Sequence, residues 1–123
     1  MTGKAVRYEV RIKRVYEPAA AADGKRILVD RLWPRGISKA AAGIDLWLKE
    51  VGPSTELRKW FGHEPARWEE FRSRYNAELA DNPAFTELGE QLTAGPITLL
   101  YGAHDEAHNQ AVVLADRLRK ARS

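Results

Sequence analysis

Apolar and polar residues alternate through residues 6–13, and this period of two is typical of a strand with one buried face. A short uninterrupted apolar run predicts an interior strand over residues 26–32, which Pro34 and Gly36 must end. A third apolar run, residues 97–101, predicts another strand. These three segments are the strands that the pattern indicates.

Between the second and third strands, apolar residues recur at spacings of three and four, which is the period of amphipathic helices. Residues 38–61 are predicted as two short helices, and longer helices follow over residues 65–80 and from Asn82 to Gly95. A last helix is predicted after Gly102. Three polar residues are candidate N-caps of the short helices: Ser38, Asp45 and Ser54. One stripe is expected in the core: Trp68, Phe71, Tyr75 and Leu79. The last helix is expected to bury five side chains: Ala107, Ala111, Leu114, Ala115 and Leu118.

The order of these elements is strand, loop, strand, several helices, strand and helix. A helical crossover between the second and third strands makes them a parallel, right-handed pair. We therefore expect one α/β domain over residues 1–123, with a small, largely parallel sheet of three or more strands flanked by helices. The sequence leaves the direction of the first strand open.

Composition narrows the classes of function. The 123 residues are 44% hydrophobic and 30% charged, which is typical of a globular domain and not of a disordered chain. The absence of cysteine excludes disulfides, thiolate nucleophiles and zinc fingers. No apolar run has the length of a membrane span or a signal peptide, so we expect a cytoplasmic protein with no membrane partner. Neither a phosphate loop nor a dinucleotide-binding fingerprint is present, and we expect no cofactor.

Charge is unevenly distributed, although the net charge is only +3. The formal net charge is +6 over residues 1–40, −6 over residues 41–110 and +3 over residues 111–123. Basic terminal segments make nucleic acid a possible but not favoured partner, because such charge more often lies on solvated faces of ordinary elements. Arginine outnumbers lysine 13 to 7, which favours forked recognition of carboxylate or phosphate.

Two polar segments are expected to meet where the second and third strands end, because ligands of open parallel sheets bind beyond the carboxyl ends of the strands. Residues 31–36 bring two guanidinium groups and an indole, and residues 101–109 bring a phenol, imidazoles, a carboxylate and an amide. The expected start of a helix there favours an anion. The structural alternative places Asp30 in ion pairs with the arginines, Trp33 in the core and Asp105 at a helix N-cap.

The histidines have two interpretations. His104 and His108 are four residues apart, so on a helix they would share a face and, with Asp105 or His63, could bind a metal. A helix that starts after His104 would break this spacing, and we expect no metal. Three residues are candidates for proton transfer, although the sequence does not decide whether the protein is an enzyme: His63, His108 and Asp105.

The block RILVDRLWPRG, residues 26–36, resembles the bacterial domain-of-unknown-function family 488, of the YeaO-like kind. The resemblance continues through residues 47–50, 53–61, 99–101, 105 and 108–109 and spans nearly the whole chain. The family has no established activity, so the resemblance implies no reaction. The residues that match the pattern best form our preferred ligand site: Arg31, Trp33, Arg35, Tyr101 and Asn109.

These observations favour a small anionic ligand, bearing phosphate or carboxylate as a nucleotide does, at the carboxyl ends of the strands. Arg31 and Arg35 would clamp the anion, and Trp33 would form a wall of the pocket. Tyr101 and Asn109 would orient polar groups. Two alternatives stay open: a nucleic-acid-binding module that uses the basic terminal segments, and a non-catalytic interaction protein, for example a homo-oligomer.

Overall fold

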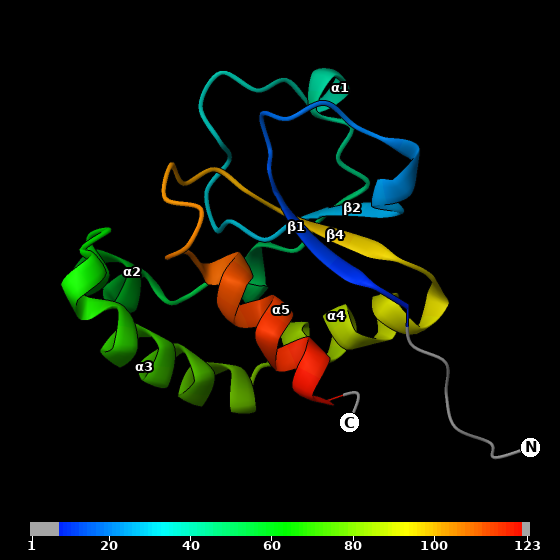
Figure 1. Cartoon of the computed structure of the whole chain (residues 1–123). Helices are drawn as coiled ribbons and strands as arrows, with labels where there is room; N and C mark the ends of the chain where they lie inside the picture. Colours follow the sequence, from blue (N-terminus) through cyan, green and yellow to red (C-terminus); the bar gives the residue numbers. More distant parts are fainter. Residues whose placement is uncertain (1–7, 122–123) are drawn as a thin grey trace, which may run out of the picture.

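Four strands and five α-helices make up the part of the chain that the computed structural model describes, residues 8–121 (Figure 1). The strands are β1 (Val10–Arg14), β2 (Lys25–Leu28), β3 (Leu46–Trp47) and β4 (Ile97–Tyr101). The α-helices are α1 (Lys39–Ala42), α2 (Thr55–Phe61), α3 (Trp68–Ala80), α4 (Pro83–Ala94) and α5 (Gln110–Ala121). Three short 3-10 helices lie between them: η1 (Ala21–Asp23), η2 (Lys49–Val51) and η3 (Pro65–Arg67).

The four strands form one parallel sheet in the order β1-β4-β2-β3. β4 lies between β1 and β2, so Ile97 pairs with Val10 on one side and with Lys25 on the other. All five residues of β4 are buried, which is why this segment is apolar throughout. The predicted α/β class and the parallel pairing of the second predicted strand with the third are confirmed, and the first strand is parallel as well.

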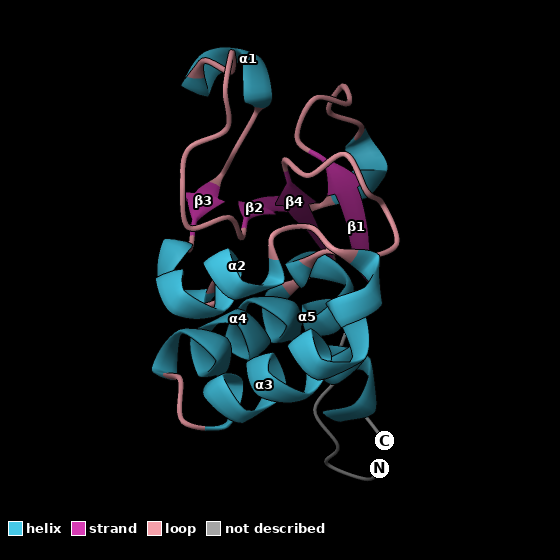
Figure 2. Cartoon of the chain, turned by 90° about the vertical axis from the view of Figure 1, so that its left-hand side faces the viewer, coloured by secondary structure: helices cyan, strands magenta, loops and turns pink. Residues whose placement is uncertain are grey.

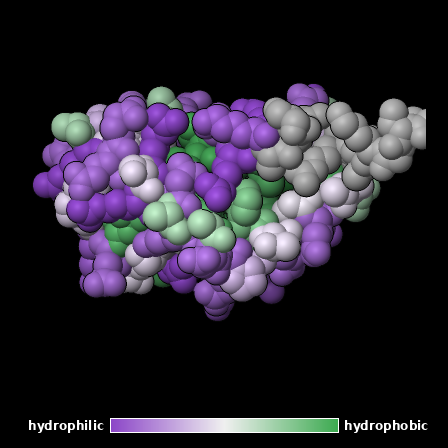
Figure 3. Space-filling model, turned by 90° about the horizontal axis from the view of Figure 1, so that it is seen from below, coloured by the Kyte–Doolittle hydropathy of each residue, from purple (hydrophilic) through white to green (hydrophobic). Residues whose placement is uncertain are grey.

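Alternation along the strands sends side chains to two differently covered faces. On one face, Ile27 and Leu99 join the main core, which α2, α3, α4 and α5 cover together (Figure 2). On the other face, Leu28 and Leu100 pack in a smaller cluster with Trp33 under α1 and the long loops. The outer surface of the helix layer is mostly hydrophilic, with small separate apolar patches (Figure 3). No helix within residues 8–121 has the length and apolar character that crossing a bilayer requires.

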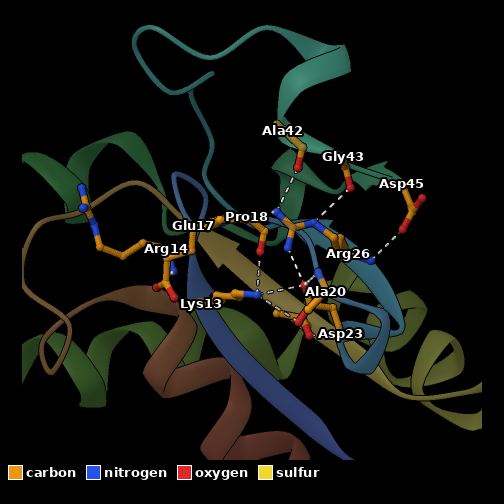
Figure 4. A network of polar contacts seen from close by, with 11 residues as sticks. Lys13, Arg14, Glu17, Pro18, Ala20, Asp23, Arg26, Ala42, Gly43 and Asp45 are labelled. Carbon is orange, nitrogen blue, oxygen red and sulfur yellow. Dashed lines mark hydrogen bonds and ion pairs between the residues drawn. The ribbon is translucent and has the colours of Figure 1, made fainter.

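A buried polar network ties the second face together (Figure 4). Arg26 is 3% exposed and donates to the Asp23 carboxylate at 2.6 Å and to the Ala42 carbonyl at 2.9 Å. Lys13 of β1 donates to the same carboxylate at 3.1 Å. Burial alone would raise the pKa of Asp23, but hydrogen bonds from the Ala20 amide, Lys13 and Arg26 outweigh burial and lower this pKa. The network therefore links β1, η1 and the end of α1 to β2.

Several predicted boundaries are confirmed. Ser38 and Ser54 cap α1 and α2, each accepting a backbone N–H three residues ahead at 3.1 Å. The third predicted strand coincides with β4, and the helix predicted from Asn82 is α4. Pro65 opens η3, which continues into α3.

The prediction of two short helices over residues 38–61 is wrong for the first of them. Ser38 starts only the four-residue α1, and the following residues form β3 and η2. Asp45 is not an N-cap, because its carboxylate accepts the Arg26 amide at 2.8 Å and so holds this segment beside β2.

Two strand boundaries differ from prediction. β1 begins only at Val10, with residues 6 and 7 outside the described part, and β2 ends at Leu28, where its pairing with β3 and β4 stops.

The last helix also begins later than predicted, at Gln110. Residues 102–109 form a loop in which the Asp105 carboxylate accepts the amides of Ala107 and His108 at 2.9 and 3.0 Å. Ala107 is exposed in this loop and not buried, because it precedes the amphipathic helix. The other four side chains predicted to be buried by the helix are buried: Ala111, Leu114, Ala115 and Leu118.

Candidate ligand-binding cavity

A cavity of about 710 Å³ lies at the carboxyl ends of the strands. Its walls come from the loops after β1, β2 and β4, and from α2 and α3. Because these loops all leave the same edge of a parallel sheet, residues distant in sequence meet there. Arg31, Trp33, Arg35 and Asn109 of the predicted site line this cavity, as do His63, Asp105 and His108. Whether they contact a ligand stays a prediction.

Asp30 contributes a half-buried carboxyl group to the cavity, two residues after the end of β2. It accepts the Gly102 amide at 2.9 Å and the side-chain amide of Gln110, so it links the two strand-end loops. Burial raises the pKa of Asp30 from 3.8 to about 6, against the opposing effect of these two hydrogen bonds. No ion pair between Asp30 and an arginine occurs within residues 8–121, so the predicted structural alternative does not describe this carboxylate.

The two predicted arginines have different environments. Arg31 is held by its surroundings, since its Nε donates to the Pro53 carbonyl at 2.9 Å and its Nη2 to the Gly52 carbonyl at 2.8 Å. Arg35 is exposed on the turn before Gly36, and its carbonyl accepts the Tyr16 hydroxyl at 3.0 Å. Arg31 therefore stabilises the wall of the cavity, whereas the side chain of Arg35 is left at its rim.

Arg58 is a third arginine of the cavity, which the sequence analysis did not single out. It lies on α2, three positions before the buried Phe61, so both side chains lie on one face of this helix. Its Nε is fully buried and has no hydrogen-bond partner within residues 8–121. None of the ion pairs in this part of the chain includes Arg35 or Arg58.

Polar groups of the loop between β4 and α5 form hydrogen bonds with one another. The His108 ring lies 2.9 Å from the Asp105 carboxylate, and this contact, with the Ala107 amide, lowers the pKa of Asp105. The Asn109 side chain accepts the Ala111 amide at 3.0 Å and donates to the Asp105 carbonyl at 2.9 Å. Asn109, and not Asp105, therefore caps α5, and the amides that were expected to attract an anion already have partners.

Tyr101 and Trp33 show how the aromatic candidates are placed. Tyr101 is 2% exposed in the main core and does not line the cavity, and burial raises its pKa. Trp33 lines the cavity, donates to the Ile37 carbonyl at 2.7 Å and packs edge-on against Trp47 at 5.2 Å. Trp33 is thus fixed as a wall, as expected of a residue that shapes a pocket.

The histidines do not share a helix face, because His104 and His108 both precede α5. Within residues 8–121, no three His, Cys, Asp or Glu side chains gather closely enough to hold a metal ion. His63 has a positive φ of 58° at the junction after α2, and the His108 ring meets Trp68 edge-on at 5.2 Å. Trp68 is only partly buried and joins the core to this wall of the cavity.

The basic residues of the terminal segments are mostly engaged within the protein. Arg14 donates to the carbonyls of Ala103 and Gly102, and Arg119 donates to the Val10 carbonyl at 2.9 Å. Arg117 donates to Asn76 and lies over the Phe85 ring. These cations hold α5 and β1 in place, while residues 7 and 122 lie outside the described part.

The all-parallel sheet with helices on its faces defines a small α/β protein, and the cavity lies beyond the carboxyl ends of its strands. Residues 9–123 match the family described as the inactive DUF488-N3 subclade, and the chain belongs to this family. It is 50% identical over 111 residues to the uncharacterized protein YeaO of Escherichia coli (strain K12), covering 89% of this chain and 96% of that protein. It is 44% identical over 109 residues to the uncharacterized protein Rv3073c of Mycobacterium tuberculosis (strain H37Rv), covering 89% and 92%. No solved structure matches the chain.

Proposed function

We propose that the cavity binds a small molecule through a phosphate or carboxylate group, with Arg58 as the principal partner of the anion and Arg35 as a second. The observation that carries this proposal is the Arg58 guanidinium, which lines the cavity and makes no ion pair or side-chain hydrogen bond within residues 8–121. Its Nε is covered by protein atoms, so a phosphate or carboxylate in the cavity would form charge-assisted hydrogen bonds with the part of the guanidinium that faces the cavity.

We propose binding without turnover. The description of the family as inactive supports this, and so does the cavity lining. Within residues 8–121 that lining has no serine, threonine or lysine that could act as a nucleophile beside His108. The Asp105–His108 pair then serves to order the loop before α5.

Nucleic acid is the less favoured partner, because Arg14, Arg117 and Arg119 already have partners in the protein. A cytoplasmic location and self-association stay predictions; the second is checked by measuring the mass of the protein in solution.

The test is anion-dependent stabilisation of the folded protein. Thermal unfolding is followed in potassium phosphate and in potassium chloride of equal ionic strength, because a ligand of the native state raises the midpoint in proportion to RT ln(1 + [L]/Kd). We expect phosphate to raise the midpoint of the wild type and of Arg11→Gln, an exposed control with the same loss of charge. Arg58→Gln should abolish the phosphate effect, and Arg35→Gln should weaken it. An equal phosphate effect in Arg58→Gln and in the wild type would refute the proposed site.

A further inference from the structure

The cavity is far larger than an anion alone requires. Its volume of about 710 Å³ lies within the range of about 300–1,000 Å³ that is usual for sites of whole small molecules. A phosphate group held by Arg58 would leave most of this space to the rest of the ligand. The residues that line the remaining space therefore indicate the chemistry of the body of the ligand, meaning the part of it that is not the anionic group.

Apolar side chains from three loops and two helices form much of the lining. Phe61 and Phe71 are 5% and 2% exposed, and their rings stack at 4.4 Å with an angle of 27°. Leu32 is 60% exposed at the rim. The apolar lining residues are Leu32, Trp33, Pro34, Pro53, Phe61, Phe71 and Ala103.

Three polar side chains of the lining already have partners within the protein. Asp30 accepts from Gly102 and Gln110, and Asn109 is occupied as the cap of α5. Asp105 is occupied by His108 and by two backbone amides. A ligand hydroxyl group placed against these three side chains would lose its water without gaining a free partner, and this costs binding free energy.

Resting on the proposed function, we infer that the ligand is an aromatic anion, in which a flat ring is attached to the phosphate or carboxylate that Arg58 holds. Phe61 lies on the same face of α2 as Arg58, so the apolar wall and the cation are adjacent. Aromatic and proline rings in the walls suit a flat ring, because aromatic groups prefer stacked or edge-on packing. Leu32 would cover the ring at the rim.

The test compares ligands that differ in one part only. The full-length protein is titrated calorimetrically with phenyl phosphate against methyl phosphate, and with benzoate against acetate, at constant ionic strength. Benzyl alcohol serves as the ring without the charge. The phosphate and carboxylate pairs show which anion the site prefers, while each pair isolates the contribution of the ring.

We expect phenyl phosphate or benzoate to bind at least 10-fold more tightly than its aliphatic partner, which corresponds to about 1.4 kcal/mol. Arg58→Gln should lose both members of the pair and, because it removes a buried donor without an acceptor, should keep its melting temperature. Leu32→Ala changes an exposed residue, so the variant should fold normally. We expect this variant to lose at least half of the preference for the aromatic over the aliphatic anion, which would show that Leu32 covers the ring at the rim.

Three outcomes overturn the inference and are distinguishable. If aromatic and aliphatic anions bind equally and Arg58→Gln loses both, the ligand is not an aromatic anion but the proposed anion site stands. If no anion binds, or if Arg58→Gln binds as the wild type does, the proposed function fails and the inference fails with it. Benzyl alcohol binding as tightly as phenyl phosphate would also overturn the inference, because the charge would then contribute nothing.

Discussion

Replacing Asp30 by asparagine tests whether the ionised carboxylate in the cavity lowers the free energy of unfolding. Burial raises the pKa of Asp30 from 3.8 to about 6, so the folded protein binds a proton that the unfolded chain releases between these pH values. The stability that Asp30 contributes is therefore fully present below about pH 3.8 and is lost as the pH rises through about 6. At 1.36 kcal/mol for each pKa unit, the ionised carboxylate lowers the free energy of unfolding by about 3 kcal/mol at pH 7.5.

Asparagine keeps the shape of the side chain and removes the charge. Its carbonyl can accept the Gly102 amide, and its amide can donate to Gln110 once the Gln110 amide group turns over. We expect Asp30→Asn to be more stable than the wild type at pH 7.5. The advantage should shrink by about 2 kcal/mol between pH 7.5 and pH 4.5, because most of the proton linkage of Asp30 lies in that interval.

Urea unfolding at a series of pH values between 4.5 and 7.5 measures this difference directly. Glu87→Gln, an exposed position on α4 with the same change of charge, is the matched control and should track the wild type throughout. Comparing variants cancels the acid destabilisation that other carboxylates, such as Asp23 and Asp105, cause in every protein of the set. Parallel stability profiles for Asp30→Asn and the wild type would refute the reasoning.

Five further substitutions follow from the structure, and urea unfolding measures each of them. Trp68→Ala should cost about 2–3 kcal/mol and Phe71→Ala about 3–5 kcal/mol, because Trp68 is only partly buried; the opposite order would contradict the assigned core. Arg26→Met should cost about 3 kcal/mol, because it leaves the buried carboxylate of Asp23 with only Lys13 and the Ala20 amide as partners, and an unchanged midpoint would show that Arg26 contributes nothing to stability. Gly24→Ala should destabilise strongly, since φ is +63° and the new methyl group would meet the carbonyl that precedes β4, whereas Gly89→Ala on α4 should stabilise by about 0.5–1 kcal/mol. Equal effects of the two glycine changes would be inconsistent with this backbone.

Local signals explain which elements could be predicted. β4 was predicted with its correct limits because Gly95-Pro96 ends α4 and an apolar run follows. β3 was missed because Leu46 and Trp47 are too short a run to show a period of two, and their neighbours repeat every three or four residues as a helix does. A tertiary contact decided the structure there: the Asp45 carboxylate binds the Arg26 amide of β2.

Sequence patterns could likewise identify some residues of the candidate site and not others. The rule that ligands lie beyond the strand ends was enough to bring Arg31, Trp33 and Arg35 to one cavity with Asn109. The period of two could have excluded Tyr101 from this cavity, because it shares the buried face of Ile97 and Leu99. Arg58 could not be singled out, since its interest lies in the partner that it lacks, and no sequence pattern reports an absent contact.

The strand order has a consequence for how the chain assembles. β1 and β2 are consecutive in sequence but never touch, because the segment that separates them in the sheet begins only at Ile97. Until that segment docks, both strands have unpaired backbone groups along their inner edges, which are templates for pairing with another chain. Contacts of such long sequence separation are also slow to form. A fragment ending before Ile97 would therefore lack the centre of its sheet, and we expect such a fragment to aggregate where the full chain folds.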